Sequence, residues 1–223
     1  MQLTFTEENY LKAIYSIELH SKSSEVSVNE IAERMSTKPA TVTDMLRKLS
    51  EKELIHYEKY KKMRLSKLGL SMALQIVRKH RLWETFLHDK LQFSWDEVHE
   101  VAEQLEHIKS NKLIERLDAY LGHPEFDPHG DPIPSATGQI PEAITQSMNE
   151  AELDRWLLIV AVKDASKPFL QQLERMGLNI GTKIKLLERL PFDKSVLVSI
   201  NGQEPIFLSE MIASNLLVSL QEG

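Results

Sequence analysis

The stretch SVNEIAERMSTKPATVTDMLRKLSEK, residues 27–52, decides the fold of the first part of the chain. Ser27 and Glu30 have the spacing of a capping box, in which a hydroxyl and a carboxylate three residues apart satisfy the first backbone N–H groups of a helix. Pro39 stands where a proline is tolerated at the start of a second helix. Two short helices joined by a tight turn are a helix-turn-helix pattern, whose second helix typically enters the major groove of DNA.

Residues 54–67 predict two short strands around a basic hairpin, the wing of a winged helix. Residues 38–67 hold nine Lys and Arg against four Asp and Glu, which concentrates positive charge where phosphates would lie. The alternative is a three-helix core and a hairpin that pack together without binding DNA. The residues expected to contact DNA are Lys38, Pro39, Ala40, Thr41, Thr43, Asp44, Arg47, Lys48, Lys59, Lys61 and Lys62. Of these, Thr41, Thr43 and Asp44 are candidates for base edges, and Lys38, Arg47, Lys59, Lys61 and Lys62 for phosphates.

The charge is distributed unevenly along the chain. The formal net charge is −6, yet residues 1–80 carry 14 Lys and Arg against 10 Asp and Glu. A basic front end on an acidic protein is typical of a nucleic-acid-binding module joined to another domain. The chain has no cysteine, which excludes disulfides, thiolate metal sites and cysteine nucleophiles. Its first residues do not resemble a signal peptide, so we expect a soluble cytoplasmic protein.

Histidines and glutamates recur at helical spacing between residues 79 and 107. Side chains three or four residues apart share one face of a helix, so such groups can converge on one point. Imidazole with carboxylate is a ligand set for a borderline or hard divalent cation. The candidate ligands are His80 and Glu84, one turn apart, and His99, Glu103, Glu106 and His107 at offsets i, i+4, i+7 and i+8.

The fold class expected is mainly α with small β parts. Helices are predicted at 6–19, 68–90, 94–108 and 111–121, and a helical dimerisation domain is expected to follow the winged helix. From residue 153, strands at 156–162, 183–190, 195–200 and 206–208, with helices at 167–176 and 209–217, predict a small β-barrel. We expect domains at 1–73, 74–141 and 142–223.

Two other features allow more than one interpretation. Trp83, Phe86 and Leu87 could form apolar edges for a dimer interface, or they could be buried within one subunit. Residues 122–141 hold five of the nine prolines, and we interpret them as a structural loop. On that interpretation His123, Asp127, His129 and Asp131 are not ligands.

Several motifs together resemble the diphtheria toxin repressor (DtxR/MntR) family of metal-dependent bacterial repressors. They are ENYLKAIY (8–15), KPATVTDMLRKL (38–49), RKHRLWE (78–84), VHEVAEQLEH (98–107) and PHGDPIP (128–134). The resemblance covers residues 1–140, and the C-terminal segment looks like the SH3-like (FeoA-type) domain of the longer members.

This resemblance implies a homodimer that binds a palindromic operator when Mn²⁺ or Fe²⁺ is present, with two metal sites per chain. His80, Glu84 and His99 match one site; Asn9, Glu103, Glu106 and His107 match the other. Two departures matter: position 103 differs from the iron-type members but agrees with the manganese-type members, and position 9 differs from the expected residues. Glu103 stands where iron-type members have cysteine, Asn9 replaces Met or Asp, and Lys12 occupies a position where short manganese-type members place a glutamate ligand. Oxygen donors in place of sulfur favour Mn²⁺ or Fe²⁺. In the third domain, Asp164 and Gln171 are weaker candidates for the acidic and amide metal ligands of the iron-type relatives.

The function expected is metal-dependent repression of metal-homeostasis genes, without enzymatic activity. No HExxH, GxSxG, Walker or GxGxxG motif is present. Two alternatives stay open: a winged-helix regulator that senses a non-metal ligand through its C-terminal barrel, and a metal store or metal-dependent enzyme that does not bind DNA.

Overall fold

The computed structural model describes residues 2–20, 25–57, 62–142 and 144–220. The chain divides into two compact units. The first unit consists of Met1–His80, Glu103–Asn111 and Pro134–Gln139. The second consists of Arg81–Ala102, Lys112–Ile133 and Ile140–Gly223. The predicted fold class, mainly helical with small β parts, is confirmed.

The first unit contains the predicted helix-turn-helix. Its helices are α1 (Phe5–His20), α2 (Val28–Arg34) and α3 (Pro39–Glu51). The capping box is present. The Ser27 hydroxyl oxygen accepts a hydrogen bond from the backbone N–H of Glu30, and the backbone N–H of Ser27 donates one to the Glu30 carboxylate. Pro39 occupies the first turn of α3. The local signals in the sequence therefore fix the ends of both helices.

The wing begins with strand β1 (Ile55–His56) and returns as β2 (Arg64–Leu65), which pairs with it antiparallel. A bridge between Val26 and Met63 extends the pairing. Helix α1 holds the returning strand, because the Glu18 carboxylate accepts a hydrogen bond of 2.6 Å from the backbone N–H of Leu65. The tip of the predicted hairpin, with Lys59 and Lys61, lies outside the described residues.

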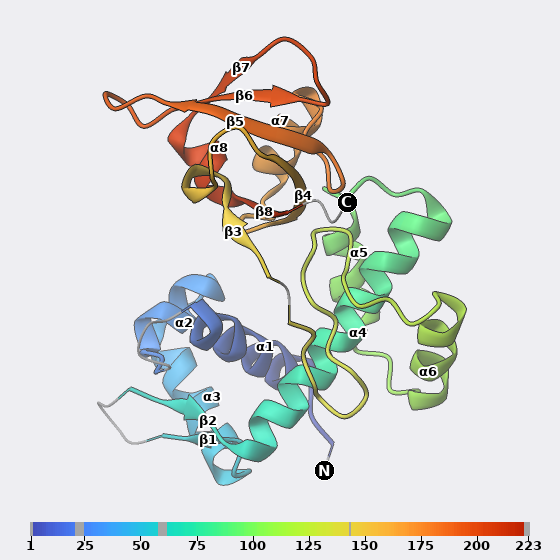
Figure 1. Cartoon of the computed structure of the whole chain (residues 1–223). Helices are drawn as coiled ribbons and strands as arrows, with labels where there is room; N and C mark the ends of the chain where they lie inside the picture. The colour runs from blue at the N-terminus through green and yellow to red at the C-terminus, as the bar shows by residue number, and fades with distance from the viewer. Residues whose placement is uncertain (1, 21–24, 58–61, 143, 221–223) are drawn as a thin grey trace. The chain divides into compact units, whose positions relative to one another are not determined.

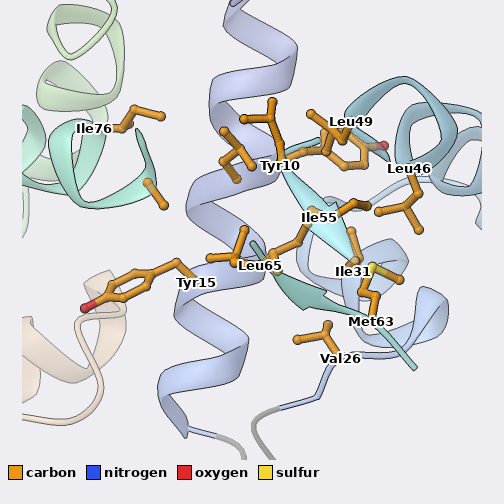
Figure 2. Packing of buried hydrophobic residues seen from close by; sticks show 14 of the residues in the cluster. Tyr10, Tyr15, Val26, Ile31, Leu46, Leu49, Ile55, Met63, Leu65 and Ile76 are labelled. Carbon is orange, nitrogen blue, oxygen red and sulfur yellow. The ribbon is translucent and has the colours of Figure 1, made fainter. Parts of the chain in front are cut away.

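Helix α1 lies at the centre of the apolar core of the first unit (Figure 2). Its Tyr10 and Leu11 belong to one buried apolar cluster with Ile31 of α2 and with Leu46 and Leu49 of α3. Burying side chains of this size contributes roughly 1.5–3 kcal/mol each. The position of α1 is therefore tied to that of the helix-turn-helix.

Three more helices follow: α4 (Lys67–Leu91), α5 (Val98–Leu105) and α6 (Asn111–Tyr120). Helix α5 is shorter than the predicted 94–108. Ser94 and Glu97 hydrogen-bond to each other in a turn that precedes the helix.

Trp83 and Leu87 are buried within the chain. Of the helices in the described residues, none has both the length and the apolar character needed to cross a membrane.

The C-terminal part forms an antiparallel sheet (Figure 1), whose order in the described residues is β3-β8-β4-β5-β6-β7. The strands are β3 (Gln146–Ser147), β4 (Trp156–Val162), β5 (Lys183–Arg189), β6 (Val196–Ile200), β7 (Ile206–Leu208) and β8 (Leu216–Leu220). Helices α7 (Lys167–Arg175) and α8 (Glu210–Asn215) and the 3₁₀ turn η1 (Met148–Glu150) complete it. Helix α8 is shorter than predicted, because the chain extends into β8 from Leu216.

The proline-rich segment is fixed against β4 within the second unit. Val162 donates a backbone hydrogen bond of 3.0 Å to the carbonyl of His129. Gly130 has φ +83°, and a Cβ added there would lie 2.0 Å from the carbonyl oxygen of Val160. Only glycine combines this conformation with so close an approach. These two contacts hold the backbone at His129 and Gly130 against β4.

Candidate metal centres

The first unit gathers seven polar side chains around the N-terminal half of α1, which we name the α1 cluster. Glu8, Asn9 and Lys12 come from α1, His80 from α4, Glu103 from α5, and Glu106 and His107 from the turn that follows α5. The spacing of the α1 residues, i, i+1 and i+4, places them on neighbouring faces of one helix.

Glu106 is the most buried member of the α1 cluster, with a side chain 0% exposed. Its Oε2 lies 2.7 Å from the ammonium of Lys12 and 2.5 Å from Nδ1 of His80. Lys12 also reaches Oε1 of Glu103 at 2.5 Å. Burial by itself raises the pKa of Glu106, but the hydrogen bond from His80 and the charge of Lys12 outweigh burial and hold the pKa below its ordinary value.

His107 lies beside α1 and makes a close hydrogen-bond contact with it. Its Nδ1 is 2.5 Å from Oε2 of Glu8, and its ring stacks on Phe5 with centroids 4.6 Å apart. Lys79 adds positive charge nearby. Burial lowers the pKa of Lys79, while the charges of Glu8 and Glu106 act in the opposite direction. The α1 cluster is therefore a site where buried anions are balanced by cations.

Two oxygen atoms of the α1 cluster are buried and accept no hydrogen bond within the part of the chain that the structure describes. They are Oδ1 of Asn9 and Oε1 of Glu106. A buried acceptor without a partner costs roughly 1–3 kcal/mol. With imidazole and carboxylates beside them, these oxygens form a donor set suited to Mn²⁺ or Fe²⁺. The residues present therefore fit a divalent cation.

A second group of ligand-type side chains lies in the second unit, and we name Glu84, His99, Asp127 and His129 the loop cluster. One ligand atom from each of Glu84, Asp127 and His129 lies within 4.8 Å of the others, and all three residues are buried. Glu84 also connects α4 to α5, because its Oε1 lies 3.2 Å from Nδ1 of His99. Two carboxylates and imidazoles again match a hard or borderline divalent cation.

The loop cluster has perturbed protonation equilibria. Burial raises the pKa of Asp127 to about 8, and the charges of Glu84 and Asp131 act in the same direction. Burial alone would lower the pKa of His129, but its contacts with Glu84 and Asp127 raise it to about 9. Arg81, whose Nε lies 3.6 Å from Asp127, adds a fixed positive charge. Near neutral pH these shifts favour a protonated Asp127 and a charged His129, which with Arg81 offsets the charge of buried Glu84.

The structure keeps the expected grouping of Glu84 with His99 and that of Glu103 with Glu106 and His107, and it adds partners that spacing did not indicate. The structure brings His80 to Glu106, and it brings Glu84 to His99, Asp127 and His129. The sequence interpretation of residues 122–141 as structural loop missed Asp127 and His129. The motif Asp-Pro-His-Gly-Asp (127–131) could have indicated a tight turn at these residues. Oδ1 of Asp127 accepts hydrogen bonds from the backbone N–H groups of His129 and Asp131 and so stabilises that turn.

The remaining candidates lie elsewhere. Asp164 caps a turn by accepting the backbone N–H of Ser166, and Gln171 donates to Asp96. Of the predicted DNA-contacting residues that the structure describes, Thr43 is half-buried and donates to the Pro39 carbonyl. The others are exposed: Lys38, Pro39, Ala40, Thr41, Asp44, Arg47, Lys48 and Lys62.

Comparisons with known proteins cover nearly the whole chain. The family model described as "Iron dependent repressor, N-terminal DNA binding domain" matches residues 2–63. "Iron dependent repressor, metal binding and dimerisation domain" matches 66–135, and "FeoA domain" matches 146–220. Among solved structures, a manganese-dependent transcriptional repressor in complex with manganese is 34% identical, with TM-score 0.84 over 95% of this chain and 98% of that one.

The chain belongs to the diphtheria toxin repressor family. Another member of known structure, ScaR with bound Cd²⁺, is 34% identical with TM-score 0.78 over 96% of this chain and 99% of that chain. The diphtheria toxin repressor of Corynebacterium jeikeium is 33% identical over 153 residues, which are 69% of this chain. That alignment spans 62% of the length of the C. jeikeium protein. The family consists of metal-dependent transcriptional repressors.

The electrostatics of the loop cluster can be tested by a histidine titration. In chelator-treated protein, Asp127→Asn removes a carboxyl group whose charge helps to raise the pKa of His129, so this pKa should fall below about 9, while Glu84 keeps it above the ordinary value of 6.5. Two-dimensional NMR of the histidine ring signals measures it. Asp131→Asn, which changes a carboxylate half exposed to solvent, is the matched control and should leave His129 unchanged. A wild-type His129 that already titrates near 6.5 would contradict this account.

Proposed function

We propose that the protein is a repressor that binds a palindromic operator as a homodimer in response to Mn²⁺ or Fe²⁺, and so controls genes of metal homeostasis. The observation that carries the proposal is the α1 cluster, in which a helix of the DNA-binding unit shares a buried carboxylate site with the turn after α5. Family membership supports the same function, which operates by binding and not by catalysis.

Two groups of residues would hold the cations. At the α1 cluster the ligands are Asn9, Glu103, Glu106 and His107, with Glu8 paired to His107. At the loop cluster they are Glu84, Asp127 and His129, with His99 beside Glu84. A bound dication would supply the charge that neutralises the buried carboxylates. We favour Mn²⁺ because the donors are oxygen and imidazole nitrogen, and because solved relatives are described as manganese-dependent.

Helix α1 can transmit the state of the α1 cluster to the DNA-binding surface. Asn9 and Glu8 lie toward one end of α1, while Glu18 near the other end holds strand β2 of the wing through Leu65. Between them, Tyr10 and Leu11 are buried against α2 and α3. A shift of α1 relative to Glu106 therefore displaces the wing and recognition helix together. Couplings of this kind typically amount to about 1–3 kcal/mol.

The DNA-binding surface would consist of exposed residues at the start and outer face of α3 and in the wing. Lys38 precedes the helix as its N-cap, and the small side chains of Pro39, Ala40 and Thr41 in its first turn would allow close approach to base edges. Arg47, Lys48, Lys59, Lys61 and Lys62 would contact phosphates, with Thr43 and Asp44 nearer the bases. Asp44 is 3.5 Å from Arg47, so it can orient that guanidinium as well as accept from a cytosine amino group.

The proposal also covers the domain limits and the location of the protein. We propose a DNA-binding domain at 1–73, a metal-binding and dimerisation domain at 74–141, and a linker with an SH3-like domain at 142–223. A repressor of this kind acts in the cytoplasm, where bacterial DNA lies. The dimer brings two α3 helices to half-sites about one helical turn, ~34 Å, or a multiple of that distance apart.

The metal dependence is tested with Glu106→Gln, which keeps the shape of the side chain but removes its charge. The duplex is selected from a random-sequence pool with Mn²⁺ present, and affinity is measured by fluorescence anisotropy. Wild-type protein should bind at least about ten-fold more tightly with Mn²⁺ than with chelator, and the variant should lose this difference. His107→Ala should behave alike, and His123→Ala, an exposed histidine outside both clusters, should behave as wild type. Full Mn²⁺ stimulation in Glu106→Gln would refute the proposal.

The DNA-contacting surface is tested by the salt dependence of binding. Lys48→Ala and Lys62→Ala should each weaken binding to all sequences and reduce the slope of log affinity against log salt by about 1. Lys194→Ala, an exposed lysine in the β5–β6 hairpin, is the control and should leave the slope unchanged. Equal slopes for all four proteins would show that these lysines do not contact phosphate.

A further inference from the structure

Lys12 places a positive charge inside the α1 cluster. Its ammonium lies 2.5 Å from Oε1 of Glu103 and 2.7 Å from Oε2 of Glu106. Both carboxylates belong to the ligand set proposed above. A carboxylate pair that would hold a dication is thus held by a side chain of the protein itself.

The lysine satisfies only part of the α1 cluster. An ammonium has three donors and no preference for a particular coordination geometry. Oε1 of Glu106 and Oδ1 of Asn9 accept no hydrogen bond from any described residue, although both are buried. Nε2 of His107 lies 4.0 Å from that same Oε1. A divalent cation, which takes several oxygen and nitrogen ligands at once, would use the donors that Lys12 leaves unsatisfied.

The side chain of Lys12 can also leave. It is 18% exposed, whereas Glu106 is 0% exposed. A lysine on the rim of a site can swing its ammonium into water while its methylene groups stay against the protein. Glu106 has no such freedom, so the buried anion needs a cation whenever the protein is folded.

We propose that Lys12 is a tethered competitor for the metal: its ammonium neutralises Glu103 and Glu106 in the metal-free protein, and a divalent cation binds by displacing it. This inference rests on the proposed function of the α1 cluster. Lys12 stabilises the metal-free protein by neutralising the charges of Glu103 and Glu106. It also weakens metal affinity, which raises the ion concentration at which the protein responds.

The test replaces Lys12 with methionine, which keeps the unbranched chain and removes the charge. A His129→Gln background removes a ligand of the loop cluster, so that Mn²⁺ titrations by calorimetry report the α1 cluster. Lys12→Met should bind Mn²⁺ about ten-fold more tightly, equivalent to about 1.4 kcal/mol, and its metal-free form should melt at a lower temperature. Lys12→Arg keeps the charge and should retain weak binding and the stability of the metal-free form.

Lys52→Met is the matched control, since Lys52 makes a similar lysine–glutamate pair with Glu7 of α1, outside the proposed ligands. It should lower the melting temperature without changing Mn²⁺ affinity. Unchanged or weaker Mn²⁺ binding by Lys12→Met, with wild-type binding intact, would overturn the competitor role alone. A failure of both proteins to bind Mn²⁺ at this site would overturn the proposed function as well.

Discussion

The structure of the first unit depends on how it accommodates one buried carboxylate, that of Glu106. A charged group removed from water costs several kcal/mol unless it is paired. Glu106 is paired with Lys12 from α1 and His80 from α4, and it remains ionised, with its pKa below the ordinary value. The requirement for a cation at this point therefore links two helices that are distant in sequence. A protein that must neutralise an internal anion can be controlled by the cation available to do so.

Helix α1 converts this local requirement into a property of the DNA-binding surface. The helix is buried against α2 and α3 and holds strand β2 through Glu18. Close-packed interiors transmit displacements, because side chains cannot be compressed. On the proposed function, metal sensing and DNA binding share one rigid element, and no long chain of intermediate contacts is needed.

Much of this arrangement was predictable from sequence, because the signals are local. The capping box of Ser27 and Glu30, Pro39 and the apolar spacing of α3 fix the helix-turn-helix. Helical spacing also identified His80, Glu84, His99, Glu103, Glu106 and His107. Spacing within a helix does not show which residues of different helices meet, so the pairing of His80 with Glu106 was not predicted. Asp127 and His129 were missed because their direction is set by a loop that β4 holds in place through Gly130 and Val162. The role of Lys12 is also tertiary, since its partners follow it by more than 90 positions.

The central claim is that the α1 cluster binds a divalent cation. Anomalous diffraction at the manganese absorption edge, from crystals of the full chain grown with Mn²⁺, tests it most directly. The account predicts an anomalous peak within coordination distance of Glu103, Glu106 and His107, with the carboxamide of Asn9 among the ligands. Crystals that show Mn²⁺ elsewhere, with no peak between these side chains, would contradict it.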